Sequence, residues 1–175
     1  MKFIIGLLAI ALATPVGAQD RLDPQHSALA DLAGAWTVQQ SLWLGDAATP
    51  KVDSGTADFT MVLNGHQLQQ SLHIADGSNF EGLGYIGFDN ASGQYFSTWM
   101  DVNFPGIVVA YGGFDPTANT YVLKGSMSSS TPGAGAVPVR EVMTIQDSDH
   151  FRYDYYETHA GKEALTVRLD YTRSR

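Results

Sequence analysis

The chain of 175 residues contains no cysteine. This absence excludes disulfide bonds, a cysteine nucleophile and the lipid-modified cysteine of a lipoprotein anchor. Basic residues are also scarce, with 10 Lys and Arg against 18 Asp and Glu, and a net charge of −8. An acidic chain without a Lys/Arg cluster is repelled by polyanions. We therefore expect neither nucleic acid nor an anionic membrane surface among its partners.

Motifs for catalysis and metal binding are missing as well. The sequence has no G-x-S-x-G nucleophile elbow, no glycine-rich phosphate loop and no H-E-x-x-H or H-x-H pair. An inward-facing strand histidine could ligate haem iron, but nothing in the sequence supports that role for His73 or His159. We expect no metal ion and no cofactor, and we consider an enzyme less consistent with this sequence than a non-catalytic protein.

No apolar run is long enough to span a bilayer, yet the N-terminus carries a short one. Lys2 precedes an apolar stretch over residues 3–13, about 11 residues, whereas a membrane span needs roughly 20. Small residues at Val16 and Ala18 then match the spacing required by signal peptidase. We expect residues 1–18 to be a cleaved signal peptide, and a periplasmic or secreted protein of a Gram-negative bacterium. Residues 19–34 then form an N-terminal segment with a short helix, and residues 35–175 the main domain.

One helix and ten strands are expected after this leader. Asp23 and Pro24 are typical of a helix start, and Gly34 follows the last apolar residues as a stop signal. Beyond Gly34 the apolar period changes from 3.6 to 2, which indicates strands. Asn64-Gly65 is the clearest hairpin signal among the turns. The expected strands cover residues 36–44, 57–63, 68–74, 80–88, 94–102, 107–114, 121–127, 137–146, 151–158 and 164–172.

Short connections make neighbouring strands antiparallel, because a parallel crossover needs a dozen or more residues. The pattern predicts an all-β protein, an antiparallel up-and-down barrel of about ten strands with one short N-terminal helix. A two-sheet sandwich is the alternative. Some strands are apolar on both faces, as where Phe96 and Met100 alternate with Tyr95 and Trp99. One face would meet the interior, and the other would lie under the helix or in a homodimer contact, with residues 107–110 as the candidate strip.

Three segments resemble a known family. Residues 26–36, H-S-A-L-A-D-L-A-G-A-W, resemble the H-x-x-L-x-x-L-x-G-x-W opening of a bacterial lipocalin-like family, domain-of-unknown-function family 1579. Residues 82–101 and the closing segments around Arg140, Gly161 and Tyr171 are similar to the same family, which usually has Tyr where this chain has Phe88. The resemblance implies a calycin-like barrel and no established reaction. Calycin relatives mostly hold small apolar molecules, an implication by analogy of fold alone.

The resemblance also implies a structural role for Trp36 and Arg173. In lipocalin-like barrels a Trp of the first strand often packs under a late Arg, which closes the barrel base through a cation–π contact.

Six residues are candidates for ligand contact: Tyr85, Tyr95, Trp99, Asp101, Arg140 and Tyr155. Asp101 and Arg140 could bind a ligand head group if they face the interior; alternatively they face solvent or pair with each other. Tyr and Trp make rigid apolar walls with a polar tip, but they are also ordinary strand-forming residues.

Three functions are compatible with this pattern. The first is a binding protein for a small apolar or amphipathic ligand held in the barrel. The second is a structural or interaction barrel with a packed interior, which would use its outer apolar strip. The third is a small isomerase or cyclase acting through an interior acid and a Tyr, which an interior carboxylate with a strongly raised pKa would favour.

Overall fold

The computed structural model describes residues 22–45, 48–75, 77, 79–129 and 135–175. The expected signal peptide and its cleavage site lie outside the described residues. One helix, α1 (Pro24–Ala30), precedes the strands, and a short 3-10 turn, η1 (Leu63–Gly65), lies between the second and third of them. The strands are β1 (Gly34–Leu42), β2 (Lys51–Val62), β3 (Gln67–Ile74), β4 (Phe80–Asp89), β5 (Gln94–Asp101), β6 (Phe104–Asp115), β7 (Thr120–Met127), β8 (Val137–Ile145), β9 (His150–His159) and β10 (Lys162–Arg173).

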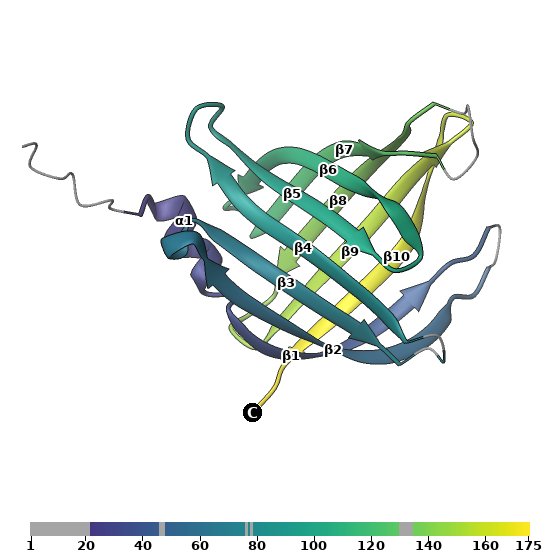
Figure 1. The fold of residues 1–175 in the computed structure, drawn as a ribbon, viewed down its shortest axis with the longest axis horizontal. Helices are drawn as coiled ribbons and strands as arrows, with labels where there is room; N and C mark the ends of the chain where they lie inside the picture. Colours follow the sequence, from purple (N-terminus) through teal and green to yellow (C-terminus); the bar gives the residue numbers. More distant parts are fainter. Residues whose placement is uncertain (1–21, 46–47, 76, 78, 130–134) are drawn as a thin grey trace, which may run out of the picture.

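The ten strands form one closed barrel, which confirms the expected architecture and excludes the sandwich (Figure 1). Each strand pairs antiparallel with its sequence neighbour, and β1 pairs with β10 to close the ring. Two strands begin three or more residues earlier than predicted. β2 starts at Lys51 rather than Ala57, and β6 starts at Phe104, opposite Asp101, where a turn was expected.

Side-chain burial follows the period of two. On β1, Trp36 and Val38 are buried, whereas Thr37 and Gln39 are exposed. The same alternation corrects our prediction for residues 107–110. Val108 and Ala110 face the interior and belong to the buried residues, whereas Ile107 is 47% exposed. Because successive side chains of a strand point to opposite faces, these four residues do not form one outer strip.

α1 covers one end of the barrel (Figure 1), with Leu29 and His26 buried against it. Asp23 stands at the start of this helix, as its sequence signal indicated, but its side chain does not cap the helix. The Asp23 carboxylate makes no hydrogen bond to the helix amides and instead accepts one from Asn90 Nδ2 at 2.6 Å. The helix also ends at Ala30, before Gly34, whose φ of +131° opens β1. We call this the α1 end of the barrel.

Aromatic side chains fill the interior next to α1. The rings of Phe151 and Tyr171 stack with centroids 4.1 Å apart, and Trp36 meets Phe151 edge to face at 4.7 Å. Phe59 contacts both Phe151 and Tyr171 at 5.7 Å. The Trp36 indole, 1% exposed, also donates a hydrogen bond from Nε1 to the Leu32 carbonyl. This half of the barrel is therefore solid core.

Candidate functional site

The other half of the interior holds a cavity of about 350 Å³. Its residues come from β1, β3–β10 and the β5–β6 connection, at the end of the barrel opposite α1. The lining is formed by Gln40, Leu42, Gln70, Leu72, Phe80, Tyr85, Ile86, Ser97, Thr98, Trp99, Asp101, Asn103, Phe104, Val108, Met127, Glu141, Tyr153, Tyr155, Glu157, Val167 and Leu169. Apolar and aromatic side chains thus alternate with a small number of polar groups. That composition is typical of small-molecule sites.

Trp99 forms part of the cavity wall because β4 carries glycines opposite it. A Cβ on Gly82 would lie 2.1 Å from the Trp99 indole, and one on Gly84 would lie 2.9 Å from it. In the register of β4 and β5, Gly84 is directly opposite Trp99. The two glycines therefore leave the space that the indole occupies, and Trp99 lies flat along the wall.

Asp101 holds Trp99 and the start of β6 in place. Its Oδ2 accepts a hydrogen bond from Trp99 Nε1 at 2.9 Å. Its Oδ1 accepts from the backbone N–H groups of Asn103 and Phe104 at 2.8 and 2.9 Å. Both carboxylate oxygens are thus positioned by charge-assisted hydrogen bonds.

Glu141 is the most deeply buried charged residue of the lining, with 3% of its surface exposed. Ser97 Oγ donates a hydrogen bond to its Oε2 at 2.5 Å, and Tyr153 makes a second side-chain hydrogen bond to the carboxyl. Burial raises the pKa of Glu141 above its ordinary value, and these two hydrogen bonds offset only part of that effect. The carboxyl therefore retains its proton to a higher pH than an exposed glutamate does.

Tyr155 lies among the acidic groups of the cavity. Its hydroxyl donates to Met127 Sδ at 3.4 Å. Burial is the main reason why the pKa of its phenol is raised. The negative charges of Glu157, Glu141 and Asp101 add to that rise. Three carboxylates of the lining thus act on one phenol.

The structure brings four of the six candidate ligand contacts to the cavity: Tyr85, Trp99, Asp101 and Tyr155. Tyr95 is elsewhere, in the core, where its ring meets Phe88 at 5.0 Å and Tyr121 at 4.9 Å.

Arg140 does not face the interior. It alternates with inward-facing Val139 and Glu141, so it lies on the outside of β8, where its guanidinium binds Glu163 through Nε and Nη2. It also lies 3.8 Å from the centroid of the Tyr156 ring. Asp101 and Arg140 are therefore not brought together. Sequence reasoning left the inward face of β8 open and did not name Glu141, although its position between apolar Val139 and Met143 carried the signal.

Comparison with known proteins places the chain in a family. Residues 22–173 match the family described as "Protein of unknown function (DUF1579)". The chain belongs to the DUF1579 family. A comparison with curated proteins gives no match.

A solved structure shares the barrel fold of the DUF1579 chain. The crystal structure of Rv2717c from M. tuberculosis is 20% identical, with a TM-score of 0.67, and the match covers 89% of this chain and 100% of that one. A redesigned β-barrel is 15% identical, with a TM-score of 0.42 and coverage of 85% and 96%. At these identities the likeness to Rv2717c shows the fold alone.

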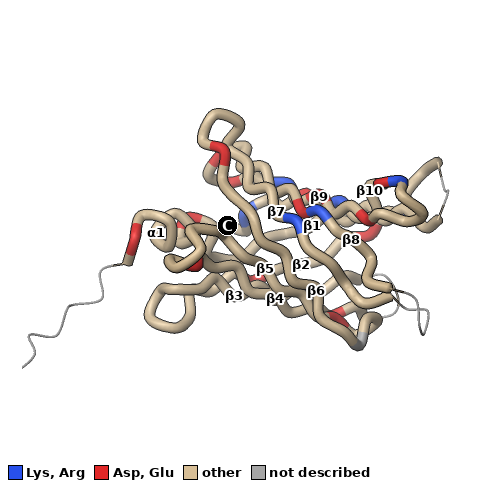
Figure 2. Tube along the Cα trace, turned by 90° about the horizontal axis from the view of Figure 1, so that it is seen from above, with Lys and Arg blue, Asp and Glu red and all other residues tan. Residues whose placement is uncertain are grey.

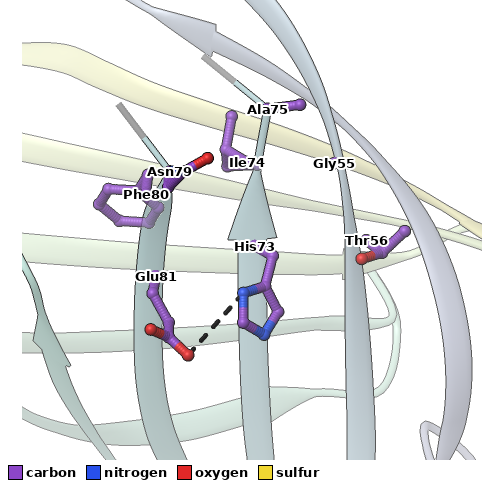
Figure 3. Close-up of a pocket in the computed structure, with 8 residues that line it drawn as sticks. All are labelled: Gly55, Thr56, His73, Ile74, Ala75, Asn79, Phe80 and Glu81. Carbon is purple, nitrogen blue, oxygen red and sulfur yellow. Dashed lines mark ion pairs between the residues drawn. The ribbon is translucent and has the colours of Figure 1, made fainter. Parts of the chain in front are cut away.

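A second cavity of the DUF1579 chain, of about 340 Å³, lies outside the barrel over β2, β3 and β4 (Figure 3). His73 and Glu81 form a pair at 3.9 Å there, but both side chains are more than half exposed. A pair so exposed contributes little binding energy. We therefore take the interior cavity as the candidate site.

Within the described ranges, no group of three or more His, Cys, Asp or Glu side chains is arranged to hold a metal ion. In the same part of the chain, no helix has the length and apolarity to cross a bilayer.

Proposed function

We propose that this DUF1579 protein is an exported binding protein that holds a small apolar or amphipathic ligand in the interior cavity. The observation that carries the proposal is the cavity itself, about 350 Å³ and bordered by Trp99, Tyr155 and Phe80. This volume lies near the lower end of ligand sites, which run from about 300 to 1,000 Å³. A short-chain or single-ring ligand suits it.

The distribution of core residues supports this function over a barrel with a packed interior. Aromatic rings fill the α1 end, so the barrel has its rigid base there. At the other end the lining includes hydrogen-bonding groups, such as Gln40 and Gln70, that a purely structural core would avoid. Gln70 is itself oriented, since its Nε2 donates to the Tyr171 hydroxyl at 2.8 Å.

One observation favours a second candidate, a small isomerase or cyclase. Glu141 is an interior carboxyl with a raised pKa, and Tyr153 is in hydrogen-bond contact with it. A carboxyl whose pKa is raised by burial is better suited than an exposed one to donate its proton to a bound substrate. A ligand recovered from the cavity that is chemically unchanged on incubation would leave binding as the function.

Export and self-association complete the proposal. Export rests on the signal-like residues 1–18.

A homodimer would use the outer apolar side chains of β5 and β6, of which Met100, Ile107 and Tyr111 are the exposed members. Light scattering at high protein concentration tests this contact, and a monomer throughout would remove it.

Ligand binding is tested by native mass spectrometry of protein purified from its natural host, combined with organic extraction. We expect a discrete added mass that extraction removes. A matched pair of variants locates the ligand. Leu42→Trp fills the cavity mouth and should abolish the adduct, whereas Leu44→Trp, at a residue 63% exposed and outside the lining, should retain it. An adduct retained by both variants would place the ligand elsewhere and overturn the proposal.

A further inference from the structure

The cavity wall is acidic and carries no basic side chain. Its charged residues are Asp101, Glu141 and Glu157, and among the lining residues that the structure describes none is Lys or Arg. A barrel that binds fatty acids or other anions would need a cationic partner at this position, because a buried anion without one is strongly disfavoured.

Basic residues of the described chain lie elsewhere. Figure 2 shows Lys and Arg gathered over the strands β7–β10. Arg140 pairs there with Glu163, and Arg168 with Asp154, both on the outer face. Lys51 lies at the rim opposite Leu42, but it is paired with Asp53 at 2.9 Å. The field inside the cavity is therefore set by its own carboxyl groups.

Side-chain and backbone contacts hold these three carboxyl groups, which line the same cavity as Tyr155. Ser97 and Tyr153 hold Glu141, while Trp99 and two backbone amides hold Asp101. His159 Nε2 contacts Glu157 Oε2 at 2.6 Å. All three act electrostatically on the phenol of Tyr155. A cationic group beside Tyr155 would meet acceptors that need no rearrangement.

We propose that the cavity selects an amine-bearing amphiphile over a carboxylate of the same length, with the ammonium group beside Tyr155. The apolar body of the ligand packs against Trp99 and Phe104. The inference rests on the proposed function and adds the chemical class of the ligand. The ammonium gains ion pairing with the carboxylates and a cation–π contact with the aromatic walls. A carboxylate in the same place is repelled by like charges.

Three eight-carbon probes test the selection: n-octylammonium, 1-octanol and octanoate. Isothermal titration calorimetry at about pH 7.5 keeps octanoate ionised, and about 0.15 M salt screens the acidic surface. We expect octylammonium to bind at least about tenfold more tightly than octanoate, with octanol between them. Octanoate binding as tightly as octylammonium would overturn the inference and leave the proposed binding function standing. Binding of none of the three would overturn the binding function itself.

Isosteric variants separate cavity charge from overall charge. Glu141→Gln and Glu157→Gln should each reduce the ratio of octylammonium affinity to octanol affinity at least about threefold. The control is Asp58→Asn, at an exposed residue on the outside of β2, which should leave the preference intact. An equal loss in the control would assign the preference to net charge and overturn the inference.

Discussion

The guanidinium of Arg173 lies 4.1 Å from the ring centroid of Trp36 and closes the α1 end of the barrel. This contact joins the last strand to the first. The same guanidinium donates three hydrogen bonds at 2.8 Å: from Nη1 to the Ala33 carbonyl, from Nη2 to the Asp31 carbonyl and from Nε to the Ser148 carbonyl. One side chain thus links β10, the β8–β9 turn and the segment after α1.

Removing either partner of this contact should destabilise the fold. Trp36→Ala leaves a cavity in the aromatic core and should cost about 3–5 kcal/mol of unfolding free energy, which lowers Tm by roughly 10 °C. Arg173→Ala leaves three carbonyls without this donor and should cost about 1–3 kcal/mol. Thermal denaturation followed by circular dichroism measures both. The control is Arg152→Ala, which removes a half-exposed pair with Asp170 worth about 0–1 kcal/mol. Wild-type Tm in Trp36→Ala would contradict this account of the barrel base.

The glycines opposite Trp99 should be essential to the cavity. Gly82→Ala places a methyl group where the indole lies, so Trp99 must move and the cavity must change shape. We expect altered tryptophan fluorescence and at least about a tenfold loss of ligand affinity. Gly113→Ala is the matched control, because its Cβ would meet nothing within 4 Å and should change neither signal. Unchanged fluorescence in Gly82→Ala would mean that Trp99 is not packed on β4.

Glu141 should make the fold less stable as pH rises. Its pKa is raised in the folded state by burial, so the native protein binds this proton more tightly than the unfolded chain does. Stability from this group is therefore fully present below the unfolded pKa of about 4.3 and declines as pH rises from there through the folded pKa. Each pKa unit corresponds to about 1.4 kcal/mol.

Glu141→Gln removes this titration while retaining the shape of the side chain. The variant should gain stability relative to the wild-type protein at pH 8 and much less at pH 4, as measured by urea denaturation at each pH. A stability difference that is the same at both pH values would show that Glu141 does not titrate with a raised pKa.

Export predicts a defined mature end. Expression of the full chain in a Gram-negative host, followed by osmotic shock and intact-mass analysis, should give periplasmic protein that begins at Gln19. Replacing Ala18 with a bulky residue should leave the precursor uncleaved. Recovery of the wild-type chain in the cytoplasm with residues 1–18 intact would refute export.

Most of the fold follows from patterns of residue type along the sequence. Alternating apolar residues and Gly/Asn/Asp turns identify all ten strands because a closed antiparallel barrel has one buried face throughout. The start of β2 was not predicted because the positions in phase with buried Ala57 and Phe59 are Lys51, Asp53 and Gly55, which give no apolar alternation. The start of β6 was not predicted because Pro105-Gly106 has turn composition. In the structure these two residues lie at an irregularity of the β5–β6 pairing, between the pairs Asp101–Phe104 and Trp99–Val108.

The candidate site was harder to foresee than the fold. Trp99 and Asp101 were candidate ligand contacts, and both line the cavity. On β8 the candidate was Arg140, which lies with Val142 on the outer face. A buried Glu is unusual, so a glutamate is not expected to face the interior of a barrel. Glu141 is recognised as inward-facing only because it alternates in step with apolar Val139 and Met143, which belong to the core face of β8. The partners of Glu141, Ser97 and Tyr153, come from β5 and β9 and cannot be read from local sequence.

The most direct test of the central claim uses the indole N–H signals of the three tryptophans in a ¹⁵N NMR spectrum. Trp99 lies on the cavity wall, whereas Trp36 is enclosed in the aromatic base at the other end. During titration with 1-octanol, the Trp99 signal should shift and saturate while the Trp36 signal stays in place. A Trp99 signal that does not move at saturating octanol would contradict the account.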